Sequence, residues 1–204
     1  MSTFDARFDQ VMGIVDQSGK CLGQDRTEWR EFLRYAAAYF QARGIDRPVV
    51  VEIGTLDGAQ KQFYEVLLSA EHIGISLPQT ESASADIVGD STKPGTLAAL
   101  GDRLAGRSID LLFIDGNHSI GYVKADLANY GPLTAHLIAL HDLYGDDGTP
   151  GMDVGKAWEM VRAKYPGGPA QTFLTFHHQR RFEATSIWPG HEMGIGLIVK
   201  GGQP

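Results

Sequence analysis

The chain has 204 residues, a length that suits one domain of ordinary size. Hydrophobic residues make up 43% of it and charged residues 21%, so it can bury a substantial core and is not a disordered tail. With 18 Lys and Arg against 25 Asp and Glu, its formal net charge of −7 argues against a general binder of nucleic acid.

The first 46 residues are expected to form a helical N-terminal extension that acts as a lid or simply packs on the domain. Apolar residues at helical spacing predict a short helix over 4–15, and a glycine-containing break follows at 18–23. A second helix is expected from Thr27, as its N-cap, to Gly44, as its C-cap. The acidic start does not resemble a signal peptide, and no apolar run approaches the ~20 residues that span a bilayer. We therefore expect a soluble cytoplasmic protein with no membrane partner.

From residue 49 onward, short apolar runs alternate with helical segments. The predicted strands are 49–53, 72–76, 86–88, 109–114, 136–141, 171–176 and 193–200, and the predicted helices between them are 58–70, 94–105, 119–130 and 153–164. This alternation predicts an α/β fold with a doubly wound, mostly parallel sheet of seven strands and helices on both faces. No clear helix separates the last two strands, so the last strand is expected to be antiparallel.

Polar residues follow several predicted strands, at the edge where open parallel sheets bind their ligands. After the first strand, Gly54 and Gly58 would allow a tight turn close to a ligand, with the acid Glu52 beside it. The spacing matches neither the G-x-G-x-x-G of a dinucleotide fold nor a phosphate-binding P-loop, and glycines at such a turn are explained equally well by the fold alone. Asp90 and Ser91, after the third strand, are individually better explained as a helix cap.

The fourth and fifth strands end in Asp115, His118, His141 and Asp142. An aspartate directly after an apolar strand is costly unless it meets a metal, a cap or a ligand. If these two strands are neighbours, Asp115, His141 and Asp142 converge, because adjacent strands lie ~4.8 Å apart. Two carboxylates and an imidazole suit Mg²⁺ or Mn²⁺. Taken singly, each of the three is better explained as a capping or rim residue, and the lone cysteine, Cys21, excludes a thiolate cluster.

These segments carry a family resemblance. VVVEIGTLDG (49–58), GDST (89–92), IDLLFIDGNHSIGYVKADLANYGPL (109–133) and LIALHDL (137–143) resemble class I S-adenosylmethionine-dependent methyltransferases. More narrowly, they are similar to the branch that contains cephalosporin-hydroxylase-like proteins and the metal-dependent sugar and macrolide O-methyltransferases. The likeness covers roughly residues 48–165, and the later pair Val154 and Trp158 also fits.

The resemblance implies a Rossmann-like methyltransferase domain over residues 47–204 and assigns a role to each site residue. The cofactor-binding residues would be Glu52, Gly54, Thr55 and Gly58 at the methionine part of S-adenosylmethionine, Ser76 at its ribose, Asp90 and Ser91 near its adenine, and Asp115. Asp115, His141 and Asp142 would hold Mg²⁺ or Mn²⁺, and His118 falls at the position of the general base.

The implied reaction is O-methylation of a small hydroxylated molecule, a natural product or a saccharide. His118 would accept the proton of a hydroxyl whose pKa a metal ion has lowered, and the oxygen would then attack the sulfonium methyl group in line. The chain departs from the family pattern at several positions: Ser76 replaces an acid that binds both ribose hydroxyls, Asn117 an aspartate, and Ile120 a tyrosine. In addition, Thr134, Ala135 and His136 stand where the family commonly has Gly-Gly before the fifth strand.

Two alternatives stay open. One is a metal-independent methyltransferase with His118 as its sole base, and the other is a non-catalytic or cofactor-altered protein in which Ser76 reflects a weakened hold on the cofactor. The set of Asp115, His118, His141 and Asp142 favours the enzyme. The segment after the sixth strand is expected to line the acceptor pocket or to form a solvated loop; its polar and aromatic residues are His177, His178, Arg180, Arg181, Trp188 and His191. A homo-oligomer is possible.

Overall fold

The computed structural model describes residues 3–78, 85–144, 152–164, 171–178 and 193–201. Within these ranges the helices are α1 (Phe4–Ser18), α2 (Arg26–Ala42), α3 (Ala59–Leu67), α4 (Pro94–Leu104), α5 (Ile120–Tyr130) and α6 (Val154–Lys164), with a short 3₁₀ turn at Gly131–Leu133. The strands are β1 (Val49–Ile53), β2 (Glu71–Ser76), β3 (Ile87–Val88), β4 (Ile109–Ile114), β5 (Thr134–Leu140), β6 (Gln171–Phe176) and β7 (Ile195–Lys200).

The strands form one sheet in the order β3-β2-β1-β4-β5-β7-β6. The pairs from β3 through β5 are parallel, whereas β7 runs antiparallel to both of its neighbours, β5 and β6. The prediction of a seven-stranded, mostly parallel, doubly wound sheet with an antiparallel last strand is therefore confirmed. None of the described helices is long and apolar enough to cross a membrane.

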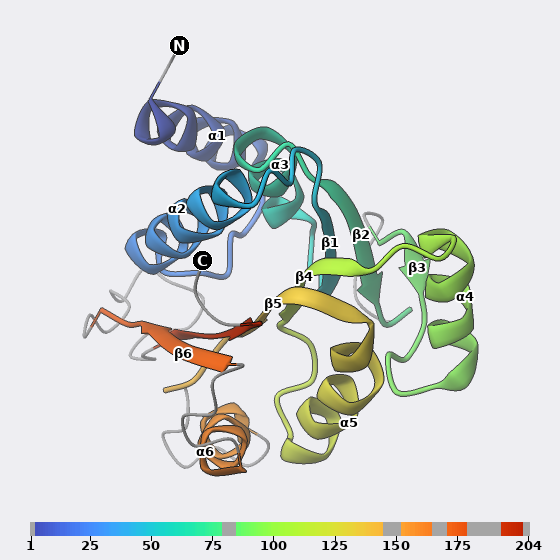
Figure 1. Ribbon diagram of the computed structural model, residues 1–204. Helices are drawn as coiled ribbons and strands as arrows, with labels where there is room; N and C mark the ends of the chain where they lie inside the picture. Colours follow the sequence, from blue (N-terminus) through green and yellow to red (C-terminus); the bar gives the residue numbers. More distant parts are fainter. Residues whose placement is uncertain (1–2, 79–84, 145–151, 165–170, 179–192, 202–204) are drawn as a thin grey trace.

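Each face of the sheet carries its own hydrophobic core, because the strands are apolar on both sides. Helices α1, α2 and α3 cover one face, and α4, α5 and α6 cover the other (Figure 1). Along β1, Val50 points into the first core while Val49 and Val51 point into the second, which is the alternation of a strand buried on both faces. The division of the chain at residue 46 stays a prediction, but the helices before it share the first core with the sheet.

The second N-terminal helix begins earlier than the sequence predicts, and the N-cap assignment of Thr27 is wrong. Asp25 is the N-cap of α2, because its side chain accepts hydrogen bonds from the backbone N–H groups of Thr27 and Glu28. A carboxylate two residues upstream satisfies two free N–H groups, whereas Thr27 lies inside the first turn. At the other end Arg43 is the C-cap, and Gly44 follows it with a positive φ of 64°.

The exposed seam between α1 and α2 is a row of ion pairs. Three arginines of α2 contact three aspartates of α1: Arg26 with Asp16, Arg30 with Asp9, and Arg34 with Asp5. Two of these arginines also cover aromatic rings, Arg30 over Phe8 and Arg34 over Phe4. Exposed pairs of this kind contribute about 0–1 kcal/mol each, so the seam sets the alignment of the helices more than their stability.

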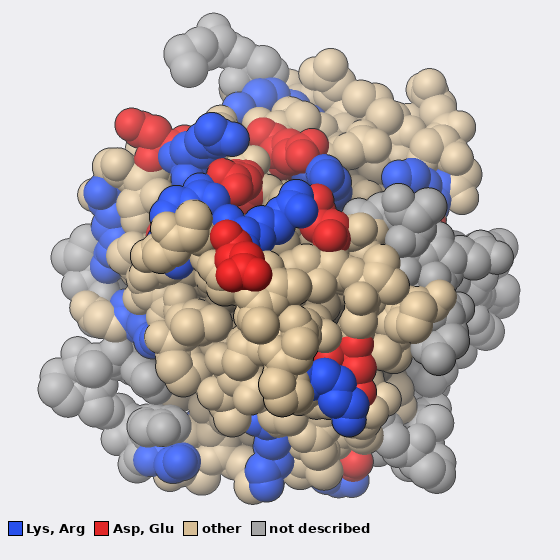
Figure 2. Space-filling view, turned by 90° about the vertical axis from the view of Figure 1, so that its right-hand side faces the viewer, with Lys and Arg blue, Asp and Glu red and all other residues tan. Residues whose placement is uncertain are grey.

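Basic and acidic side chains also lie side by side on the face at the β3 and α4 end of the sheet (Figure 2). Arg107 pairs with Glu71 at 2.8 Å and Arg103 with Asp86 at 2.7 Å near this sheet edge. The face in Figure 2 therefore carries mixed charge rather than a continuous basic surface.

Trp29 of α2 joins the N-terminal helices to the sheet. Its indole is fully buried and packs on Phe63 and Tyr64 of α3 and on Phe113 of β4, with ring centroids 5.3–6.1 Å apart. We expect Trp29→Ala to lower the free energy of unfolding by about 3–5 kcal/mol, since it leaves a large cavity between helix and sheet. Chemical denaturation measures this, with Arg26→Ala in the exposed seam as control; similar stabilities for the two variants would contradict it.

Candidate functional site

The candidate site lies where the strand order reverses. β1 lies between β2, which leads to one edge of the sheet, and β4, which leads to the other. At such a switch point the loops that leave the carboxyl ends of the two central strands turn apart and open a crevice, which is where doubly wound sheets bind ligands.

Gly54, directly after β1, permits the closest approach of two of these loops. Its φ is +92°, and a Cβ atom built there would lie 2.1 Å from the backbone oxygen of Asp115. The neighbouring backbone hydrogen bonds are those of Gly54 N–H to Ile75 O, at 2.9 Å, and of Asp115 N–H to Ile53 O, at 2.8 Å. Only glycine fits this position, and the contact holds the loop after β4 against the loop after β1.

A cavity of about 620 Å³ fills the crevice, a size that accommodates a small-molecule cofactor or ligand. Its described lining runs from the ends of β2 and β3 to the ends of β4 and β5. The lining residues singled out from the sequence are Gly54, Ser76, Asp90, Ser91, Asp115, His118 and Asp142. Others are apolar, among them Leu56, Leu77, Met152 and Met193. The described lining thus contains three aspartates and no lysine or arginine.

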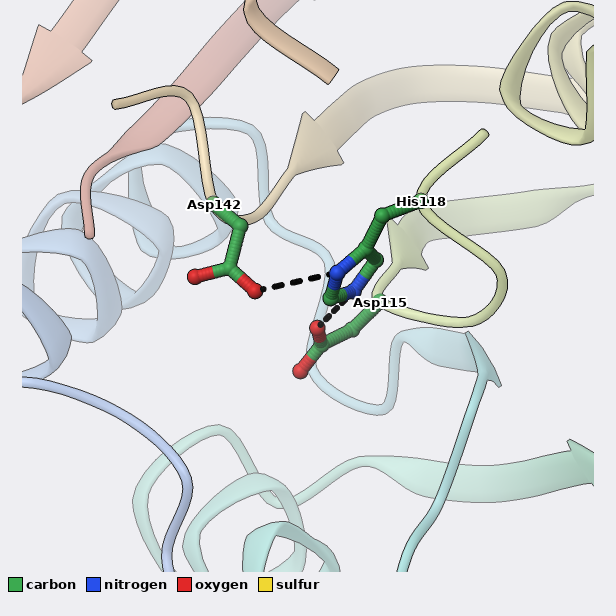
Figure 3. Close-up of side chains that lie close together, drawn as sticks. All are labelled: Asp115, His118 and Asp142. Carbon is green, nitrogen blue, oxygen red and sulfur yellow. Dashed lines mark ion pairs between the residues drawn. The ribbon is translucent and has the colours of Figure 1, made fainter. Parts of the chain in front are cut away.

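At one end of the cavity, His118 lies between two carboxylates (Figure 3). Its Nε2 is 3.5 Å from Asp115 Oδ1, and its Nδ1 is 3.4 Å from Asp142 Oδ2. The ligand atoms that the three residues offer all lie within 4.8 Å of one another, close enough to share one cation. His118 also contacts Met152, whose Sδ is 3.3 Å from Nδ1.

His141 approaches the same carboxylates from the end of β5. Its Nδ1 lies 3.1 Å from Asp115 Oδ1 and 3.4 Å from Asp142 Oδ1, and its side chain is 1% exposed against 22% for His118. β4 and β5 are adjacent and parallel, with Ile114 opposite Leu140, so the residues that follow each strand meet. The predicted convergence of Asp115, His141 and Asp142 is confirmed. Asp142 adopts a positive φ of 60°, which aspartate tolerates better than most residues.

The two carboxylates and two imidazoles stabilise one another's charges. Burial by itself would raise the pKa of Asp115, but the charges and hydrogen bonds of His141 and His118 lower that pKa to about 2. Burial would lower the pKa of both histidines; Asp142 and Asp115 outweigh this and raise the pKa of His141 well above its ordinary value, and chiefly Asp115 raises that of His118. The carboxylate pair therefore requires nearby positive charge, which protons or a metal ion can supply.

No protein-family model matches the chain, and no curated protein matches it in sequence. Solved structures match it in fold. A putative caffeoyl-CoA O-methyltransferase from Staphylococcus aureus superposes with a TM-score of 0.58 at 13% identity, over 95% of this chain and 92% of that one. TomG, an O-methyltransferase from Streptomyces achromogenes solved with S-adenosylmethionine, gives a TM-score of 0.52 at 14% identity, over 99% and 100%. This chain has the Rossmann-like methyltransferase fold.

A third match is MycE, a methyltransferase of mycinamycin biosynthesis solved with Mg, S-adenosylhomocysteine and mycinamycin VI. It gives a TM-score of 0.51 at 16% identity, over 83% of this chain. The matched region is only 49% of MycE, so this chain spans about half the length of that protein.

Four of the residues singled out from the sequence do not line the cavity of this methyltransferase fold. Thr55 and Gly58 lie in the turn after β1, where Gly58 N–H donates to Thr55 O. His141 is buried and contacts Asp115, which itself lines the cavity. Glu52 is fully buried, with its Oε2 2.7 Å from His72 Nε2 on the neighbouring strand. Their assignments as cofactor or metal residues stay predictions. Residues 179–192, with Arg180, Arg181, Trp188 and His191, lie outside the described part of the chain.

Two residues of α5 that were not predicted as site residues hold the loop at Asp90 and Ser91. The hydroxyl of Tyr130 donates to Ser91 O at 2.8 Å, and the fully buried carboxyl group of Asp126 lies beside the Ser91 side chain. Burial raises the pKa of Asp126 to about 6, although the nearby Ser91 side chain opposes the shift. The sequence signal for this role is the position of Asp126, a charged residue on the buried face of α5 with Val123 and Tyr130.

This raised pKa gives a prediction for stability. The folded protein holds the Asp126 proton more tightly than the unfolded chain does, so this stabilising contribution is complete below about pH 4 and is lost as the pH rises to about 6. We expect Asp126→Asn to raise the free energy of unfolding at pH 7.5, by about 2–3 kcal/mol, and by clearly less at pH 4.5. Urea denaturation at both pH values tests this, with the exposed Asp102→Asn as control. A change that is equal at the two pH values would contradict it.

Proposed function

We propose that this protein is an S-adenosylmethionine-dependent O-methyltransferase that uses a divalent metal ion and acts on a hydroxyl group of a small molecule. The observation that carries the proposal is the group of Asp115, His118 and Asp142 at one end of the cavity at the switch point. It places two carboxylates that can bind a cation next to a titratable imidazole, in the crevice where doubly wound sheets bind ligands.

The charge of the cavity supports a cationic cofactor. Its described lining carries Asp90, Asp115 and Asp142 with His118 and no lysine or arginine, and the whole chain has a formal net charge of −7. S-adenosylmethionine carries a sulfonium, an ammonium and a carboxylate group, so its net charge is positive, and the negative net charge of the chain favours it. We place its adenine at Asp90 and Ser91, its ribose at Ser76 and its methionine part at Gly54, with Glu52, Thr55 and Gly58 in the surrounding structure.

The donor set also fits a hard divalent cation. Ligands that share a cation at about 2.1 Å in an octahedral arrangement lie about 3 Å apart. His141 Nδ1 is 3.1 Å from Asp115 Oδ1 and 3.4 Å from Asp142 Oδ1, close to that spacing. Asp115, His141 and Asp142 would therefore hold Mg²⁺ or Mn²⁺, and a cation bound there lowers the pKa of a hydroxyl that it contacts.

His118 is the side chain that receives the proton. It lines the cavity, and its ring is more exposed than that of His141, so a substrate can reach it. Asp115 and Asp142 lie within 3.5 Å of its two ring nitrogens and stabilise the imidazolium that forms when it accepts a proton. The protein's remaining contribution is alignment: Leu56, Met152 and Met193 supply apolar walls that orient the acceptor oxygen toward the methyl group.

We propose a natural product or a saccharide as the acceptor, in line with the mycinamycin VI bound by MycE. One observation favours a second candidate, a cofactor-altered binding protein. Ser76 lines the cavity where the resemblance expects an acid, and a serine offers the ribose a single neutral hydrogen bond.

Calorimetric titration tests the cofactor. We expect S-adenosylmethionine and S-adenosylhomocysteine to bind with micromolar affinity, because the cavity retains the glycine turn and the acidic residues. The titrations are made with Mg²⁺ and again with EDTA. No heat of binding in either condition would reject the methyltransferase and leave the cofactor-altered binding protein. Once an acceptor is found in a panel of hydroxylated compounds, unchanged turnover in EDTA would remove the metal ion from the proposal.

The two histidines are distinguished by their effect on metal binding. If His141 is a ligand and His118 the base, His141→Ala should weaken Mn²⁺ binding at least tenfold, whereas His118→Ala should weaken it less than about threefold. His118→Ala should also abolish turnover while leaving the affinity for S-adenosylhomocysteine nearly unchanged. Mn²⁺ affinity is measured by titration followed by electron paramagnetic resonance. Equal losses of Mn²⁺ affinity in the two variants would show that His118 is a metal ligand as well as His141, and would contradict its role as the base.

A further inference from the structure

The loop between α1 and α2 forms part of the cavity wall. Gly23 lines the cavity. On one side of it the Cys21 N–H donates to Asp57 Oδ2 at 2.6 Å, which attaches the loop to the turn after β1. On the other side the Asp25 side chain caps α2. Gln24 lies between these two attachments, so its backbone is fixed on both sides.

The side chain of Gln24 reaches the carboxylate at the centre of the site. Gln24 is only 4% exposed, and its Nε2 donates to Asp115 Oδ2 at 2.8 Å, across 91 residues of sequence. The other oxygen of the same carboxylate, Oδ1, faces His141 at 3.1 Å and His118 at 3.5 Å. The amide thus occupies one oxygen of Asp115 and leaves the other directed toward the cation site.

The chemistry of the amide suits this task. The amide of glutamine is a neutral donor, so it orients the carboxylate without neutralising it. The negative charge of Asp115 therefore stays available to a cation. Gln24 Oε1 is buried and has no hydrogen-bond partner among the described residues. The reversed amide would place Oε1 against a carboxylate oxygen, where two acceptors repel each other, so the orientation with Nε2 toward Asp115 is the favourable one.

We propose that Gln24 is a positioning residue that holds Asp115 with one oxygen toward the metal ion, and that the N-terminal segment is thereby part of the metal site. The inference rests on the proposed function, because it concerns the same site. With Oδ2 engaged by the amide, Asp115 binds a cation through Oδ1 alone. Partners of metal ligands of this kind typically change metal affinity 10–100-fold when they are removed.

The test replaces Gln24 by methionine, which has a similar length and no amide. The matched control is Gln17→Met, the same change at an exposed position of α1. Gln24→Ala is prepared in parallel in case methionine does not fit the buried position. Three quantities are measured for each full-length variant: the affinity for Mn²⁺, the affinity for S-adenosylhomocysteine in EDTA, and the midpoint of thermal unfolding.

We expect Gln24→Met to weaken Mn²⁺ binding at least tenfold, with S-adenosylhomocysteine affinity within about twofold of wild type and Gln17→Met unchanged. A merely structural role would lower all three quantities together, and that result would overturn the inference. Wild-type Mn²⁺ affinity in both Gln24 variants would also overturn it while leaving the proposed metal site intact. If the unmodified protein itself bound no Mn²⁺, the metal part of the proposed function would fail together with this inference.

Discussion

The whole site depends on two carboxylates that the sheet brings together. Asp115 and Asp142 follow adjacent parallel strands, and their carboxylates approach each other within 4.8 Å. Two negative charges this close in a largely buried position are unstable without positive charge nearby. The imidazoles of His118 and His141 supply it when they carry protons. The same place is therefore a binding site for a cation, and a base lies beside it.

Backbone contacts between loops determine where these two aspartates lie. Because Gly54 has no Cβ, the loop after β1 packs directly against the backbone of Asp115 in the loop after β4. This contact sets the position of Asp115. Gln24 and the Trp29 cluster extend this arrangement to the N-terminal helices, which pack on the same face of the sheet. Helices that look like an extension in the sequence are thus continuous with the core.

Much of this arrangement could be predicted from the sequence, because it follows from local patterns. Apolar runs predicted every strand, and polar residues at strand ends predicted the approach of Asp115, His141 and Asp142. Contacts without a local signal could not be predicted. Gln24 is one polar residue in a short loop, and its meeting with Asp115 depends on how α1 and α2 pack. Glu52 is a different case: the resemblance implies a cofactor contact for it, and its buried carboxylate contacts His72 on the neighbouring strand, a partner that no local pattern indicated.

The residue at the end of β2, Ser76, is neutral where the family resemblance expects an acid. An acid at Ser76 would grip a ribose through two charge-assisted hydrogen bonds, which are among the stronger polar contacts. Ser76 and Asp90 line the cavity at the carboxyl ends of the adjacent strands β2 and β3, so Asp90 is the lining carboxylate nearest in the fold to this position. Under the proposed function the charges of Asp115 and Asp142 are compensated by the metal ion and the histidines, so they do not replace the lost acid. With one neutral hydroxyl at the ribose position, such a site distinguishes its cofactor less by the two ribose hydroxyls than a site with an acid there would.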